Sequence, residues 1–208
     1  MILFSKTIGS IHTLNFFSDK ERKYYKGFIE RFSNFINNSG IPNRNYLVHN
    51  LEEVKNSLLN LPIQNSSGVL VNFIGHGNEL GIGDNHGFFI NWQDILNTFQ
   101  HINAQDNIIL NTSLMCKGNG VFKLSAYVPK PYYAAFGTNT NTNSESYFFT
   151  VAVLKCCLRR DDIVVAINDQ NDQIKENNSG YEEIEQRTKD LGEVLCPQVI
   201  TQFSYIIA

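Results

Sequence analysis

Apolar runs alternate along the chain with segments in which apolar residues recur every three or four positions. Runs rich in β-branched and aromatic residues predict strands, and they lie at residues 8–17, 44–50, 68–75, 106–113, 132–138 and 199–208. The helical spacing predicts helices at residues 18–40, 51–61, 92–102 and 142 to about 160. An acidic stretch at 180–191 is less regular and is also expected to be helical.

Capping residues support these helix boundaries. Ser18 and Glu21 have the spacing of a capping box, and Gly40 is suited to end the helix that follows. Asn50 and Asn91 precede the next two helical segments, and residues 142–145 form a second capping box. Residues 78–91 contain many turn residues and predict a small hairpin.

Strands that alternate with helices predict a parallel sheet, because parallel neighbours need crossover connections. The continuous apolar run at 68–75 is typical of a strand that is buried on both faces. We therefore expect an α/β fold, a three-layer sandwich with a mostly parallel central sheet flanked by helices. Residues 1–208 show no internal repeat or linker, which favours a single domain.

Composition and net charge exclude several classes of protein. With 42% hydrophobic and 12% aromatic residues the chain is not disordered, and a net charge of −3 without a basic cluster predicts no nucleic-acid or anionic-membrane partner. The N-terminus lacks a signal-peptide pattern, and the longest apolar stretch, 147–158, is too short to span a bilayer. Four cysteines, at 116, 156, 157 and 196, do not form a disulfide scaffold. A cytoplasmic location is expected.

Two chemically active side chains follow neighbouring predicted strands. His76 stands between Gly75 and Gly77, directly after the strand at 68–75, and Cys116 follows the strand at 106–113. Functional groups of a parallel sheet collect at the carboxyl ends of its strands, so we expect His76 and Cys116 to face each other there. The competing interpretation of His76 alone is a surface histidine in a turn.

A thiol beside an imidazole predicts nucleophilic catalysis. Cys116 would attack a carbonyl carbon as a thiolate, and His76 would act as general base and later as general acid. Backbone N–H groups of Gly77 and Cys116 would then form an oxyanion hole.

Metal and nucleotide sites are not expected. Gly75-x-Gly77 and Gly81-x-Gly83 each lack the third glycine of a dinucleotide-binding loop. The histidines at 76, 86 and 101 and Cys116 do not have the spacing of zinc ligands on one element. The sequence therefore predicts a reaction that needs no metal or organic cofactor.

Residues 8–160 resemble the caspase-like (clan CD) cysteine peptidases. The segment "GHGNELGIGDNHGFFINWQDILNTF" and the later "SLMCKGNG" and "YYAAFGTNTNTNSESYFFTVAVL" are similar to the bacterial branch, often called CHAT domains. The resemblance implies a caspase-like fold and a thiol protease with a His76–Cys116 dyad. It would hydrolyse a protein or peptide substrate through a thioacyl intermediate.

The chain departs from that family where specificity is set. Leu114 stands where many members have an aspartate, and "TNTNTNSES" lacks the arginine of caspases, so the P1 preference stays open. The candidates for lining the substrate cleft are Ser113, Asn139, Asn141 and Ser144.

The resemblance also implies regulation. An activating partner, ligand or cleavage event would order loops 117–131 and 138–146, and a homodimer is an open alternative. Two other classes stay open as well: a non-catalytic caspase-like module that binds or regulates a partner, and a cysteine-dependent acyltransferase or amidase on the same sheet.

Overall fold

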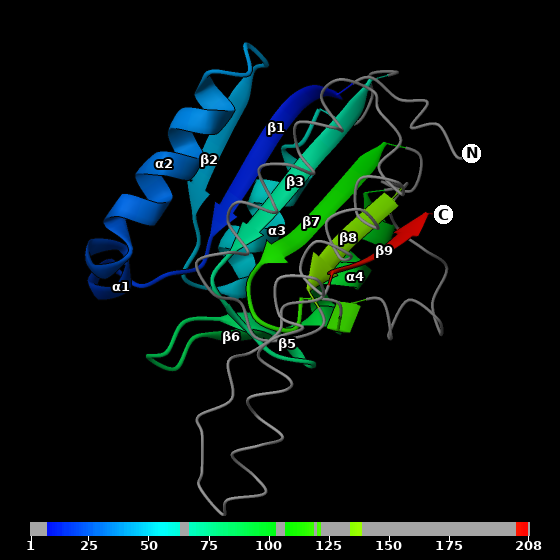
Figure 1. Ribbon diagram of the computed structural model, residues 1–208. Helices are drawn as coiled ribbons and strands as arrows, with labels where there is room; N and C mark the ends of the chain where they lie inside the picture. The colour runs from blue at the N-terminus through cyan, green and yellow to red at the C-terminus, as the bar shows by residue number, and fades with distance from the viewer. Residues whose placement is uncertain are drawn as a thin grey trace, which may run out of the picture.

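The computed structural model describes residues 8–62, 67–102, 107–118, 120–121, 134–138 and 203–207. Its main sheet has six strands in the order β2-β1-β3-β7-β8-β9 (Figure 1). In this spatial order their bounds are Asn43–Leu47, Ile8–Asn15, Gly68–Ile74, Ile108–Leu114, Ala134–Thr138 and Phe203–Ile207. Neighbours from β2 to β8 pair in parallel, and β9 is antiparallel to β8. The predicted α/β fold with a mostly parallel sheet is confirmed.

Helices lie on both faces of this sheet. The bounds of α1, α2, α3 and α4 are Asp19–Tyr24, Lys26–Asn37, Leu51–Leu59 and Trp92–His101. The chain moves from β1 to β2 in one direction across the sheet, and from β2 through β3 to β7 in the other. Because such crossovers are right-handed, α2 covers one face and α3 and α4 cover the opposite face (Figure 1). This arrangement agrees with a three-layer architecture.

The prediction of a single helix over residues 18–40 is wrong, because the helix is interrupted at Tyr25, between α1 and α2. Tyr25 has φ −89° and ψ 14°, outside the helical range. Its ring stacks on Phe17 at 4.7 Å between centroids and meets the His76 ring at 6.0 Å. These are tertiary contacts, and they override the local tendency of the chain to continue as one helix through Tyr25.

The main core lies between the sheet and the helices α3 and α4. Trp92 is fully buried and its ring stacks on Phe73, which also contacts Phe99. Asn50 caps α3 as expected, accepting a hydrogen bond from the Glu53 N–H at 2.8 Å. Strand β2 forms an edge of the sheet, and its residues are mostly exposed, Arg44 among them.

A second, small sheet carries the predicted hairpin. It consists of β4 (His76–Gly77), β5 (Gly81–Gly83) and β6 (Phe89–Asn91), paired antiparallel. The interpretation of His76 as part of a turn is wrong, because His76 pairs with Gly83 as a strand residue. This small sheet lies beyond the carboxyl ends of the parallel strands (Figure 1). Within the described part of the chain, no helix combines the length and the apolar character needed to cross a bilayer.

Acidification is expected to destabilise the fold through His12 on β1. This histidine is buried, and its ring nitrogens contact the Tyr46 hydroxyl at 3.0 Å and the Ser10 hydroxyl at 3.2 Å. Burial, followed by the charge of Arg44, lowers the His12 pKa below 6.5. The unfolded chain therefore binds the proton more tightly than the folded protein does. Stability linked to His12 is present above pH 6.5 and is lost as the pH falls toward the lowered value.

Urea unfolding at a series of pH values checks this expectation. The slope of unfolding free energy against pH just below neutrality should be shallower in His12→Gln than in the unmodified protein. His86→Gln, which changes an exposed histidine, should keep the original slope. An unchanged slope in His12→Gln would rule out His12 as the group responsible.

Candidate functional site

The candidate site lies at the carboxyl edge of the sheet, where the segments after β1, β3 and β7 meet. The connection that leaves β1 runs toward β2 on one side, and the connection that leaves the neighbouring β3 runs toward β7 on the other. Such a divergence leaves a crevice beyond the strand ends, where α/β proteins bind ligands. In Figure 1, α1 stands beyond the end of β1, and β5 and β6 lie beyond the ends of β3 and β7.

His76 is paired with a carboxylate. Its Nε2 lies 3.0 Å from Oε1 of Glu21, and the side chains of these residues are 29% and 9% exposed. The Asn85 side chain also approaches Nε2, at 3.0 Å. The carboxylate accepts a hydrogen bond from a protonated Nε2, whereas the Asn85 amide nitrogen donates to an unprotonated Nε2, so the partner of this nitrogen depends on the tautomer of His76.

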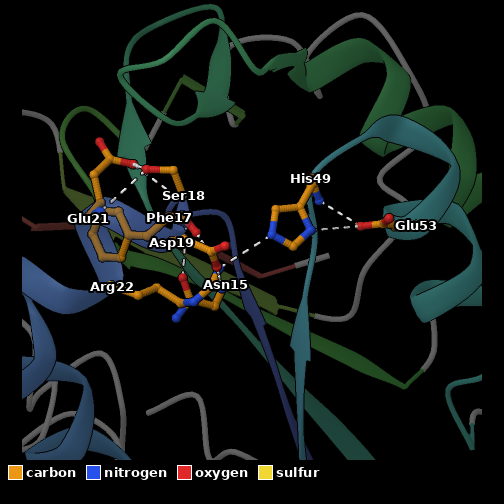
Figure 2. A network of polar contacts seen from close by, with 8 residues as sticks. All are labelled: Asn15, Phe17, Ser18, Asp19, Glu21, Arg22, His49 and Glu53. Atoms are coloured by element: carbon orange, nitrogen blue, oxygen red, sulfur yellow. Dashed lines mark hydrogen bonds and ion pairs between the residues drawn. The ribbon is translucent and has the colours of Figure 1, made fainter.

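Glu21 is held in place by its own capping box. Its Oε2 accepts hydrogen bonds from the Ser18 N–H at 2.9 Å and the Ser18 hydroxyl at 2.8 Å, and its Oε1 accepts from the Asn85 N–H at 3.1 Å. Burial raises the pKa of Glu21, but the bonds from Ser18 and Asn85 and the charge of His76 outweigh it, so the net pKa lies below 4.5. Glu21 is therefore ionised at neutral pH. Figure 2 shows its carboxylate turned toward Ser18.

Two aromatic rings cover the imidazole. Phe17 and Tyr25 meet the His76 ring edge to face, with centroids 5.3 and 6.0 Å away. Burial raises the pKa of Tyr25, and the charges of Tyr24, Glu21 and Cys116 raise it further. The Tyr25 phenol is therefore neutral at neutral pH.

Glycines allow the Cys116 loop to pack against the segment that carries His76. A Cβ placed on Gly77 would lie 2.6 Å from the Cys116 carbonyl oxygen, and one on Gly120 would lie 2.5 Å from the Glu79 carbonyl oxygen. Gly118 is tighter still, because its Cβ would lie 1.9 Å from the Thr112 carbonyl oxygen. The glycines beside His76 and Cys116 are therefore required for contact between two parts of the chain itself.

Cys116 is not part of a disulfide and is half-buried. The next residue, Lys117, has a φ of 50°, which is unusual outside glycine, and its ammonium pairs with Glu79 at 3.5 Å. The Thr112 hydroxyl closes the loop by donating to the Gly118 carbonyl at 2.8 Å. A sharp, closed turn thus presents the thiol at the end of β7.

A second polar network fixes α1 to the segments that follow β1 and β2 and to α3 (Figure 2). Arg22 donates to the Phe17 carbonyl at 2.8 Å and pairs with Asp19, and its Nη1 lies 3.4 Å from Nε2 of His49. His49 Nδ1 in turn lies 3.3 Å from Glu53. Because Arg22 is the residue after Glu21, this network restrains the helix that supplies the carboxylate.

Of the four residues predicted to line the substrate cleft, one is buried and three lie outside the described residues. Ser113 is completely buried and donates its hydroxyl to Asn111 Oδ1, so its side chain does not line a cleft in this structure. Asn139, Asn141 and Ser144 lie outside the described residues. The oxyanion-hole roles of the Gly77 and Cys116 backbone amides stay predictions. Among the described residues, no group of three or more potential ligands could hold a metal ion.

Sequence reasoning missed Glu21 as a site residue. The capping box of Ser18 and Glu21 was recognised, and it is present. The contact with His76 joins residues 55 positions apart, which local patterns do not reveal. The available signal was the position of an acidic residue just after β1, at the same edge of the sheet as His76.

Comparisons with known proteins give weak structural matches. No family model matches the chain, and no curated protein matches it. A serine palmitoyltransferase from Sphingomonas wittichii is 15% identical with a TM-score of 0.35, and the match covers 74% of this chain and 37% of that one. A high-resolution structure of SPT with the PLP internal aldimine is 13% identical with a TM-score of 0.34, over 74% and 37% of the two chains. The chain thus spans about a third of the length of these structures.

These matches correct the caspase-like interpretation. The structures reported above are serine palmitoyltransferases and not caspase-like peptidases, and no family model or curated protein connects the chain with that family. The assignment to caspase-like cysteine endopeptidases, and with it the hydrolase and thiol-protease class, is therefore not upheld. The physical reason is that loops with functional side chains collect at the carboxyl edge of parallel sheets in many unrelated proteins, so a His-Gly loop followed by a Cys-x-Gly loop does not specify one family. At TM-scores of 0.34–0.35 the matches carry no activity over to this chain either.

Proposed function

We propose that the protein transfers acyl groups through a thioester on Cys116. The observation that carries the proposal is the Glu21–His76 pair, with 3.0 Å between Oε1 and Nε2, directly beside the loop that presents the thiol. A carboxylate that orients an imidazole near a nucleophile is a recurrent solution in covalent catalysis.

The proposed reaction has two steps. In the first step His76 takes the proton of the Cys116 thiol, the sulfur attacks the carbonyl carbon of an acyl donor and forms the S–C bond, and the bond from that carbon to the leaving group breaks as the leaving group takes the proton from His76. In the second step an amine or hydroxyl acceptor gives its proton to His76 and attacks the thioester, and the S–C bond breaks as the acyl group moves to the acceptor and the sulfur takes the proton back from His76. Glu21 stabilises the imidazolium that exists between these proton transfers.

The surroundings of His76 support an acceptor other than water. Phe17 is buried, and its ring and that of Tyr25 cover one side of the imidazole. An apolar wall reduces the access of water to that side and favours an acceptor that carries its own apolar surface.

Acylation by a small acyl thioester, followed by intact-mass and peptide mass spectrometry, tests the proposal. The acyl group should be found on Cys116, and His76→Ala should slow its formation by about a hundredfold or more. An added amine or alcohol should discharge the thioester faster than water does. His86→Ala is the matched control, because His86 is an exposed histidine in the segment between β5 and β6.

Two results would contradict the proposal. One is equal acylation of the cysteines at 116, 156, 157 and 196, which would show that Cys116 has no special reactivity. The other is an acylation rate in His76→Ala equal to that of the unmodified protein.

A further inference from the structure

A row of buried polar side chains crosses the centre of the sheet, and the proposed chemistry does not use it. Asn111 on β7 donates to Asn72 Oδ1 on β3 at 2.8 Å, and Asn72 donates to the Thr13 hydroxyl on β1 at 3.4 Å. Both asparagines are completely buried. Amides at such positions stabilise less than apolar side chains of similar shape, so their presence calls for a physical reason.

The row ends at an irregularity of β7. Asn72 pairs with Asn111 and Ile74 pairs with Leu114, so two residues, Thr112 and Ser113, lie opposite the single residue between Asn72 and Ile74. This is a β-bulge, which bends a strand and redirects the side chains that follow it. Asn111 Oδ1 holds the bulge, because it accepts from both the Ser113 N–H at 2.9 Å and the Ser113 hydroxyl at 2.5 Å.

The bulge decides where the thiol lies. Met115, which follows it, is completely buried in the main core, while Cys116 is half-buried at the sheet edge. If β7 lost its bulge, each later residue would advance by one position: Met115 would take the present place of Cys116, and the thiol would move on to the present place of Lys117. Thr112, the other residue of the bulge, also closes the Cys116 loop, because its hydroxyl donates a hydrogen bond to the Gly118 carbonyl.

We infer that Asn72 and Asn111 are positioning residues, which hold the bulge in the register that turns Cys116 out to the edge of the sheet. The inference rests on the proposed function for the use of the thiol, but the placement of the thiol can be tested separately. Asn111 acts through Ser113 and touches neither the sulfur nor the imidazole in the contacts described.

The rate of Cys116 alkylation by iodoacetamide under native conditions tests the inference. Asn111→Leu keeps the size of the side chain and removes its acceptor. Without the bulge Cys116 would leave the loop position that packs on the segment of His76, so alkylation of its thiol should slow by about tenfold or more. Ser113→Ala removes only the hydroxyl bond and should have a smaller effect in the same direction. It also serves as the second variant if Asn111→Leu does not fold.

A variant that is destabilised but keeps the bulge should not show slower alkylation of Cys116. Leu58→Ala creates a cavity beneath α3, on the face of the sheet away from the amides, and its more frequent opening should leave alkylation unchanged or faster. The inference is overturned if both Asn111→Leu and Ser113→Ala alkylate as fast as the unmodified protein, or faster. The proposed function fails separately, if His76→Ala leaves acylation unchanged while Asn111→Leu still slows alkylation.

Discussion

Gly118→Ala is expected to lower the free energy of unfolding by at least about 3 kcal/mol, the upper range for overpacking. The added Cβ would lie 1.9 Å from the Thr112 carbonyl oxygen and 2.9 Å from the Thr112 Cβ. Neither contact can be relieved by a rotation of a flexible side chain, because the nearest atom is backbone. The loop must therefore move as a whole and would lose the bond from the Thr112 hydroxyl to the Gly118 carbonyl.

Urea unfolding followed by circular dichroism measures this loss. Gly27→Ala is the matched control, because Gly27 lies in α2 and a Cβ there would meet nothing within 4 Å. It should be neutral or stabilising by about 0.5–1 kcal/mol, since alanine favours helix more than glycine does. Equal stability of Gly118→Ala and the unmodified protein would show that the loop does not pack as described.

Glu21→Ala is expected to cost about 2–4 kcal/mol at neutral pH. The substitution removes the acceptor for the N–H groups of Ser18 and Asn85 and the charge partner of His76, in a side chain that is only 9% exposed. Glu21→Gln keeps an acceptor oxygen but no charge, so its cost should be smaller. Glu30→Ala, which changes an exposed glutamate paired with Lys26, should stay within about 0.5 kcal/mol of the unmodified protein.

The cost of Glu21→Ala should also depend on pH. The folded-state pKa of Glu21 lies below 4.5, so the stability that its carboxylate contributes is present above pH 4.5 and is lost as the pH falls through the lowered value. The difference in unfolding free energy between the unmodified protein and Glu21→Ala should therefore shrink as the pH falls below 4.5. A difference that stays constant over this range would mean that the charge of Glu21 contributes nothing.

Local patterns along the chain predict most of the described elements. The strand at 68–75 was predicted from its continuous apolar run, and β3 is completely buried over Gly68–Ile74. The caps Ser18 and Asn50 form as expected. These features depend on neighbours in the sequence, which is why periodicity and capping chemistry are sufficient to find them.

Features that depend on distant residues were not predictable. The break at Tyr25 depends on packing against His76, and the role of Glu21 depends on the same histidine. The pattern of buried positions does not reveal the extra residue in β7, because Thr112 and Ser113 are as buried as the residues before them. The sequence therefore located His76 and Cys116 at one edge of the sheet but not the groups that hold them.

The exposed edge strand β2 has a consequence for self-association. A strand with free N–H and C=O groups is a template on which another chain can add. Here Pro42 precedes the strand and Arg44 projects from it, with its guanidinium 5.1 Å from the centre of the Tyr46 ring. An incoming chain would have to desolvate that cation, so β2 opposes growth of the sheet into fibrils.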